Sequence, residues 1–211
     1  MKKKERKAEV KRKTKETEIK VSVNVDGKGK NKISTGIDFL NHMLDLFAYH
    51  GLFDLAIKAK GDLNIDIHHT NEDIALCLGQ VFKKALGACR GIRRFGSSEV
   101  PMDHARAKVT IDIANRFSYT GIKFKDVSVQ PVLSSIRSNK QGENYSMEDG
   151  NDFLDSFAKN LGMNLHVDIV SRSDMHHMLE AVFKALGIAM DRATEIDPRR
   201  RKEIPSTKGV L

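Results

Sequence analysis

The sequence has no tryptophan and contains few cysteines, prolines and aromatic residues. Its 211 residues include two cysteines, four prolines and only 6% aromatic residues. Two cysteines cannot form the disulfide framework of a small secreted protein, and Cys77 and Cys89 both fall in apolar helical patterns. We therefore expect two reduced, buried thiols in a cytoplasmic protein.

Long apolar stretches are also missing. The longest segment without a charged residue, 127–136, has ten residues and is too short to cross a bilayer. The lysine-rich start is followed by no apolar stretch, which argues against a secretory signal. A glycine-rich phosphate loop after a strand is missing too, which argues against a nucleotide cofactor. The remaining composition, 40% hydrophobic and 30% charged, is typical of a globular protein without a membrane partner.

The net charge of +8 is unevenly distributed along the chain. Residues 1–20 carry ten Lys and Arg against four Asp and Glu, which leaves a net +2 for the remaining chain. Residues 1–12 are therefore predicted to form a basic, solvated leader. A basic segment can bind nucleic acid. The nearly neutral body and the lack of aromatic residues among the basic ones argue against nucleic acid as the main partner.

Hydrophobic periodicity predicts the same order of elements twice. In the first half it predicts strands at 19–25, 52–59 and 63–66, and helices at 39–50 and from 70 onward. In the second half it predicts strands at 109–113, 117–122 and 164–170, and helices at 152–161 and 175–193. Residues 125–150 are predicted to form a loop or insertion. We expect an α+β fold of two pseudo-symmetric halves, 13–97 and 98–211, each with a mixed or antiparallel sheet packed on helices in one compact unit.

A polar cluster opens the last helix of each half. His68 and His69 are followed by Glu72, and His176 and His177 by Glu180. On a helix the first histidine and the glutamate share a face, whereas the second histidine is rotated by about 100°. A single copy is equally consistent with capping or surface histidines. Two copies favour metal binding, and imidazole with carboxylate favours Mn, Fe, Zn or Ni over Ca or Mg.

Further motifs run in order from about residue 10 to the C-terminus. They are Thr14-Lys15-Glu16-Thr17, Asn41-His42-Met43-Leu44, His50-Gly51-Leu52-Phe53-Asp54, Gly91-Ile92-Arg93-Arg94-Phe95-Gly96, the two double-histidine segments and 205–211. With these motifs the sequence resembles the imidazoleglycerol-phosphate dehydratase family. The resemblance implies a duplicated βα module similar to the second domain of a ribosomal protein. It also implies a hydro-lyase of histidine biosynthesis that converts imidazoleglycerol phosphate to imidazole acetol phosphate.

The resemblance implies two Mn²⁺ ions that hold the imidazole ring of the substrate while a carboxylate moves the proton. The implied metal ligands are His42, His68, His69, Glu72, Asp152, His176, His177 and Glu180. From helix geometry we expect His42, His68, Glu72 and His177 to share one ion. The other ion would take His69, His176, Glu180 and a further ligand from the second half.

Other residues match family positions at the substrate. Glu16 matches the proton-transfer glutamate, and with His68 and His177 it makes up the expected catalytic set. Residues implied to contact the substrate are Glu16, His42, His50, Arg94, Arg116, Ser206 and Lys208, of which the last four would bind the phosphate.

Without the resemblance, the same residues are also consistent with purely structural or surface roles. Glu16 could be one more charge of a charged leader, and His50 a C-terminal helix cap. The terminus at 205–211 could be a frayed tail. His166 is expected to be a buried, hydrogen-bonded histidine rather than a ligand.

The sequence also departs from the family pattern. Asp152 stands where the eighth ligand is a histidine, and Asn41, Asn64, Ile67 and His104 replace residues expected near the site. These changes remove partners that orient metal ligands. A non-catalytic metal-binding or scaffold relative is therefore the second hypothesis, and a nucleic-acid-binding module the third.

The resemblance also implies an assembly. Family members form an octahedral 24-mer built from trimers, with sites between subunits. We therefore expect a homo-oligomer.

Overall fold

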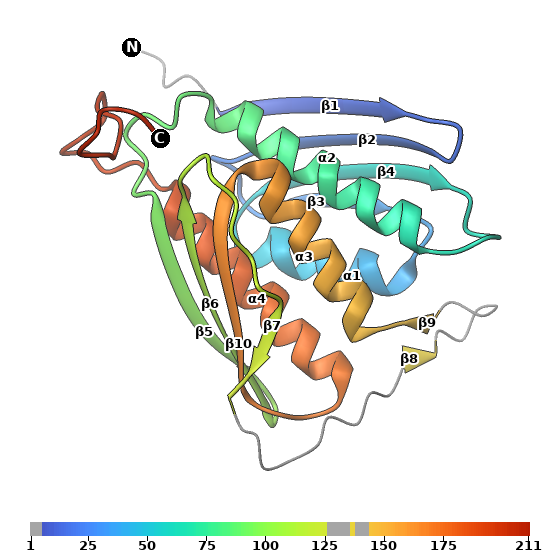
Figure 1. Ribbon diagram of the computed structural model, residues 1–211. Coiled ribbons are helices and arrows are strands. Elements are labelled where there is room, and N and C mark those ends of the chain that lie inside the picture. The colour runs from blue at the N-terminus through green and yellow to red at the C-terminus, as the bar shows by residue number, and fades with distance from the viewer. Residues whose placement is uncertain (1–5, 126–135, 138–143) are drawn as a thin grey trace.

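The computed structural model describes residues 6–125, 136–137 and 144–211, in which two four-stranded sheets have helices between them (Figure 1). The first half contains β1 (Lys7–Lys13), β2 (Thr17–Asn24), β3 (Asn31–Ser34), α1 (Asp38–His50), β4 (Asp54–Gly61) and α2 (His68–Leu86). The second contains β5 (Phe95–Met102), β6 (Ala105–Ile113), β7 (Ile122–Phe124), α3 (Met147–Leu161), β10 (Met163–Ser171) and α4 (Met175–Thr194). Between β7 and α3, the strands β8 (Ile136–Arg137) and β9 (Asn144–Tyr145) pair with each other.

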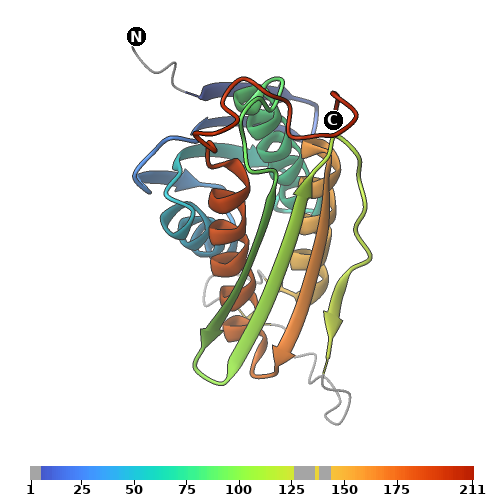
Figure 2. The same cartoon turned by 90° about the vertical axis from the view of Figure 1, so that its left-hand side faces the viewer.

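The two halves share one topology, which confirms the predicted duplication. The strand order is β1-β2-β4-β3 in the first sheet and β5-β6-β10-β7 in the second. Each sheet starts with an antiparallel hairpin and ends with a parallel pair whose strands are connected through a helix. That helix is α1 between β3 and β4, and α3 between β7 and β10. Figure 2 shows the second sheet with its strands side by side.

The helices of the two halves pack crosswise: α1 contacts α4, and α2 contacts α3. Glycines allow both close approaches. A Cβ on Gly79 of α2 would lie 2.7 Å from the carbonyl oxygen of Phe157, and one on Gly187 of α4 would lie 2.5 Å from that of Phe47. Each helix pair therefore joins the first helix of one half to the second helix of the other.

One hydrophobic core runs through both halves. Its centre is a group of aromatic rings, in which Phe47 lies 5.4 Å from Phe53 and 6.0 Å from Phe157 between ring centroids. Phe157 belongs to the second half and the other two rings to the first. Among the described helices, none is long and apolar enough to cross a membrane.

Three predicted features of the chain need correction. Residues 7–12 are no solvated leader, because they belong to strand β1, which pairs with β2 along its length. The predicted boundary after residue 97 cuts through β5, which begins at Phe95. Residues 63–66 contain a turn, closed by a hydrogen bond from the Ile65 amide to the Asp62 carbonyl, where a strand was predicted.

The end of the predicted loop at 125–150 is helical. Helix α3 begins at Met147, because Ser146 and Asp149 form a reciprocal capping box. The middle of that loop, residues 126–135 and 138–143, lies outside the described residues. His166 is a further correction: it is exposed on β10, because it alternates with buried residues along the strand.

Candidate active site

Three side chains of types that can bind a metal meet where α1 packs against α4. His42 extends from α1, and His176 and Glu180 lie one turn apart on α4. The Nε2 atoms of both histidines lie 2.9 Å from the same carboxylate oxygen, Oε1 of Glu180. All three ligand atoms fall within 4.8 Å of one another. We call this group the α1–α4 cluster; its donor atoms suit a transition metal.

A lysine holds the other oxygen of the cluster's carboxylate. Lys184 Nζ donates to Glu180 Oε2 at 2.7 Å, which leaves Oε1 to face the histidines. Burial opposes ionisation of Glu180, but hydrogen bonds from Lys184, His42 and His176 lower its pKa to about 2. Glu180 is therefore a carboxylate at neutral pH, the form that binds a metal.

A second, looser group lies where α2 packs against α3. His68 Nε2 is 3.9 Å from Glu72 Oε2, one turn further along α2, and His68 Nδ1 is 3.7 Å from Asp152 Oδ2 on α3. We call these residues the α2–α3 cluster. Asp152 therefore stands beside the other predicted ligands, where its carboxylate can serve in place of an imidazole.

These two clusters correct the predicted grouping of the ligands. His42 was expected to join His68 and Glu72, but it faces Glu180 of the other half. The crosswise helix packing is the physical reason, because it pairs the first helix of each half with the second helix of its counterpart. By the same symmetry Asp152 of α3 is the structural counterpart of His42 of α1.

The second histidine of each pair joins neither cluster. His69 Nδ1 lies 3.1 Å from Asp62 Oδ2. The hydrogen bond to Asp62 and the negative charge of Glu16 raise the pKa of His69. His177 faces the carboxylates of Asp174 and Asp103 instead. Successive residues of a helix are rotated by about 100°, as expected from the sequence, so His69 and His177 point away from the clusters that contain His68 and His176.

The predicted phosphate residues gather at the other end of the molecule. Arg94 forms two hydrogen bonds to Asp112, at 2.6 and 3.0 Å, and a third to the carbonyl of Pro205. The Arg94 amide donates to the carbonyl of Ala193, near the last residue of α4. Ala193 lies seventeen positions after His176 on α4, which is about 26 Å at 1.5 Å per residue.

The remaining phosphate residues are accessible at that end. Arg116 and Lys208 are exposed, and Ser206 is half-buried. The C-terminal segment lies at the end of the second sheet, where Asn115 Nδ2 donates to the Leu211 carbonyl at 3.4 Å. Figure 1 shows this segment far from the start of α4. Within one chain, the phosphate residues and the α1–α4 cluster therefore cannot contact one small substrate.

The replaced residues cause little disturbance in the described structure. Asn41 Oδ1 accepts hydrogen bonds from the Thr35 amide and hydroxyl at 2.9 and 2.8 Å, so it fixes the entry to α1. Ile67 packs against the core, whereas Asn64 and His104 are exposed. His50 ends α1, where burial and the charge of Lys184 lower its pKa.

Two polar residues of the site were missed. Lys184 follows Glu180 by four residues, a spacing that puts an acid and a base on one helical face and could have identified it. Asp62 belongs to a turn before α2, and its contact with His69 depends on the path of the chain, which no local spacing reveals.

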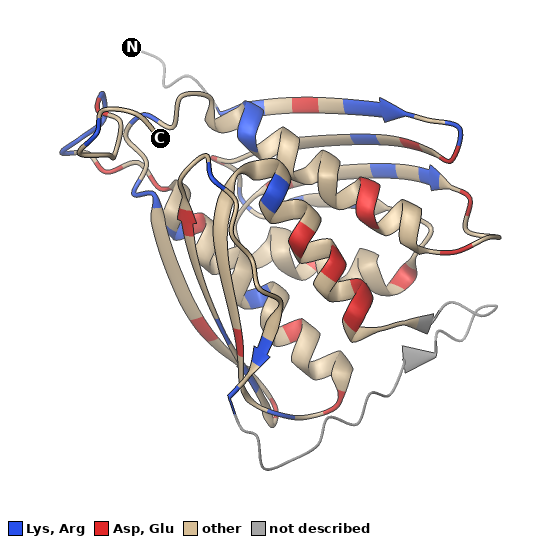
Figure 3. Cartoon of the chain, in the orientation of Figure 1, with Lys and Arg blue, Asp and Glu red and all other residues tan. Residues whose placement is uncertain are grey.

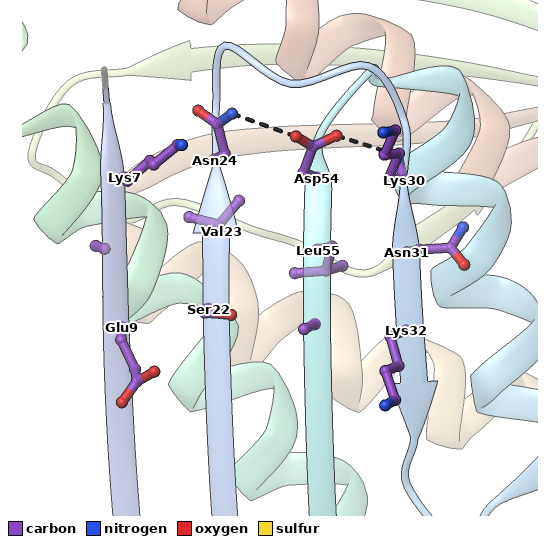
Figure 4. Close-up of a pocket in the computed structure, with 12 residues that line it drawn as sticks. Lys7, Glu9, Ser22, Val23, Asn24, Lys30, Asn31, Lys32, Asp54 and Leu55 are labelled. Carbon is purple, nitrogen blue, oxygen red and sulfur yellow. Dashed lines mark hydrogen bonds between the residues drawn. The ribbon is translucent and has the colours of Figure 1, made fainter. Parts of the chain in front are cut away.

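The outer face of the first sheet is hollowed and basic, but it lies apart from both clusters. Lys11, Lys20 and Lys58 stand opposite one another on β1, β2 and β4. Figure 4 shows one end of this face, where Asp54 accepts hydrogen bonds from Asn24 and the Lys30 amide. Figure 3 shows Asp and Glu gathered along α2 and α3 instead, on the side that carries the α2–α3 cluster.

Comparison with known proteins matches this chain to one family. The family model "Imidazoleglycerol-phosphate dehydratase" matches residues 35–190. The enzyme of that name from Geobacillus kaustophilus is 50% identical over 182 residues, 85% of this chain and 86% of its own. The imidazoleglycerol-phosphate dehydratase from Thermoanaerobacter pseudethanolicus is 49% identical over 207 residues, which cover 98% of this chain and 100% of that enzyme.

Solved structures of the same enzyme share the fold. The structure of the Pyrococcus furiosus enzyme in complex with (S)-C348 has a TM-score of 0.74 and 32% sequence identity. The match covers 96% of this chain and 100% of the chain in that structure. That from Staphylococcus aureus has a TM-score of 0.73 and 28% identity, covering 90% of this chain and 99% of its own.

Proposed function

The chain belongs to the imidazoleglycerol-phosphate dehydratase family, and from that membership we propose how its residues carry out the reaction. It is a hydro-lyase of histidine biosynthesis that converts imidazoleglycerol phosphate to imidazole acetol phosphate. The proton to be removed is weakly acidic, and hydroxide is a poor leaving group. The reaction therefore needs a positioned proton carrier and stabilisation of charge on the ring.

The single observation that supports our placement of the site is the α1–α4 cluster, in which two imidazoles and an ionised carboxylate converge. We propose that this cluster holds one Mn²⁺ and that His68, Glu72 and Asp152 hold a second. His69 and His177 face outward from both clusters and would complete the metal sites of a neighbouring chain. When bound, the metal supplies Lewis-acid stabilisation of negative charge on the imidazole ring.

The chain's own residues provide proton transfer and substrate binding. Glu16 carries the proton, and His68 and His177 belong to the catalytic set as ligands of the proposed metals. Arg116, Ser206 and Lys208 bind the phosphate through a cation, a hydroxyl and a second cation. Arg94 uses three of its five N–H donors on Asp112 and on the carbonyl of Pro205, which fixes the C-terminal segment, and its two remaining donors would bind the phosphate.

The substrate site is proposed to lie between subunits. The phosphate residues and the α1–α4 cluster lie at opposite ends of α4, about 26 Å apart by the helix rise, so one chain cannot supply both to one substrate. A symmetric assembly can bring the C-terminal end of α4 in one chain close to the N-terminal end of α4 in another chain. We take this assembly to be the family's 24-mer built from trimers.

The cytoplasm is the proposed location. Cys77 and Cys89 are both free and buried. Burial raises the pKa of the Cys77 thiol to about 11 and shifts that of Cys89 in the same direction, so both resist oxidation. Reduced thiols are the rule in that compartment.

Turnover of imidazoleglycerol phosphate by metal-stripped protein, with and without added Mn²⁺, tests the proposal. We expect product only when Mn²⁺ is present, and loss of that response in His176→Ala, which removes one donor of the α1–α4 cluster. Lys11→Ala, which alters the distant basic face, is the matched control and should respond as the unaltered protein does. Full turnover without any divalent ion would contradict the metal requirement.

A further inference from the structure

The turn between β1 and β2 carries Glu16 and is closed by local hydrogen bonds. The Thr14 hydroxyl oxygen accepts from the amides of Glu16 and Thr17, at 3.1 and 2.9 Å. The Thr14 amide in turn donates to the Thr17 carbonyl at 2.8 Å. The backbone of Glu16 is therefore held, while its side chain is exposed.

A buried carboxylate ties this turn to helix α2. The Thr17 hydroxyl donates to Asp73 Oδ2 at 2.6 Å, and Arg12 Nε donates to Asp73 Oδ1 at 2.9 Å. Thr17 is 3% exposed and Asp73 is 9% exposed, so the contact between them is shielded from competing water, whereas the Arg12 side chain is 36% exposed. One carboxylate thus holds both strands that flank the turn, and charge-assisted hydrogen bonds of this kind are strong.

Asp73 directly follows Glu72 on α2, the helix that also carries His68 and His69. The clamp therefore connects the Glu16 turn to the helix whose side chains are proposed to hold metal.

We propose that Asp73 and Thr17 are positioning residues that fix the proton-transfer carboxylate of Glu16 relative to the metal-ligating start of α2. This inference rests on the proposed role of Glu16. Neither residue touches the reacting atoms; each acts through the turn. Displacing a catalytic group by about 1 Å can cost about a hundredfold in rate, so the clamp should affect turnover more than binding.

Thr17→Val tests the clamp, because it removes the hydroxyl and keeps the β-branched shape. We expect kcat to fall about tenfold to a hundredfold while KM and Mn²⁺ affinity stay within about threefold. Thr17→Ser, which restores the hydroxyl, should recover most of the turnover. Val21→Ala, at a buried position of the same strand, is the matched control: it should lower stability without the selective loss of kcat.

The outcomes separate this inference from the function on which it depends. Loss of turnover in Glu16→Gln with full turnover in Thr17→Val would overturn the clamp and leave the role of Glu16 standing. Full turnover in Glu16→Gln would overturn that role and the clamp with it. An equal fall of kcat in Val21→Ala would show a general effect of strand stability and would also overturn the inference.

Discussion

At the scale of single residues, the site depends on which atom of each side chain is already bound. Lys184 occupies one oxygen of Glu180 and leaves the other to His42 and His176. In the same way Asp112 and the carbonyl of Pro205 take three of the five N–H donors of Arg94, which leaves two for a ligand. The sequence supplies the donors and acceptors, and these contacts decide which of them remain available for a ligand.

Glu180 should make the stability of the metal-free protein depend on pH. Its pKa is about 2 in the folded protein, below the usual 4.5, so its charge stabilises the fold above about pH 4.5. That contribution is lost as the pH falls toward 2. Glu180→Gln carries no such charge, so the difference in free energy of unfolding between the two proteins should shrink over this range.

Urea unfolding at pH 5, 4 and 3 with a chelator present measures this difference. Glu99→Gln, at an exposed ion pair with Arg106, is the control and should show a smaller change across the same range. A difference that stays constant from pH 5 to 3 would contradict the stabilising role of the Glu180 charge.

At the scale of elements, patterns of alternation and helical spacing predicted the long, amphipathic segments well. The helices expected at 39–50 and 175–193 occur as α1 and α4 within one residue at either end. Strand β1 was missed because its lysines dominate the composition, although Ala8, Val10 and Arg12 alternate with exposed residues as in an edge strand. Helix α3 begins early because a capping box outweighs its polar first turn.

Each of the two close helix contacts should determine the geometry of one cluster of proposed metal ligands. Gly187→Ala would force α1 away from α4, and Gly79→Ala would force α2 away from α3, because either Cβ meets a backbone oxygen. Each change should cost about 1–3 kcal/mol of stability. Gly187→Ala should weaken metal binding at His42 and Glu180, and Gly79→Ala at His68 and Asp152.

Mn²⁺ titration together with urea unfolding distinguishes the two variants, which serve as controls for each other. Each should lose the affinity of one class of site and keep the other. If both variants bind Mn²⁺ as the unaltered protein does, helix spacing does not set the cluster geometry.

At the scale of the whole molecule, the site is divided between the two ends of α4. The proposed metal ligands lie at its start and the proposed phosphate residues near its end. This division predicts that two inactive variants can complement each other. Co-expressed His176→Ala and Arg116→Ala chains should regain about a quarter of the activity. In a random assembly, about one site in four combines an intact metal cluster from one chain with intact phosphate residues from another.

Co-expression of His176→Ala with Glu180→Gln is the control and should give no recovery, since both changes damage the same end. Dehydratase activity per chain in the purified mixed assembly is the measurement. If the first pair stays as inactive as the second, the phosphate residues do not serve a neighbouring chain's metal cluster.

The sequence alone determined the duplicated α+β fold and the family, because helical spacing, strand alternation and ordered motifs are local properties of the chain. It also named Asp152 as a member of the ligand set, and the structure puts that side chain beside His68. Only the tertiary structure decided that His42 faces Glu180 rather than Glu72, and that Asp73 ties the Glu16 turn to α2. These contacts depend on how the two halves pack and how strands approach helices, and residues far apart in the chain carry no local signal of that packing.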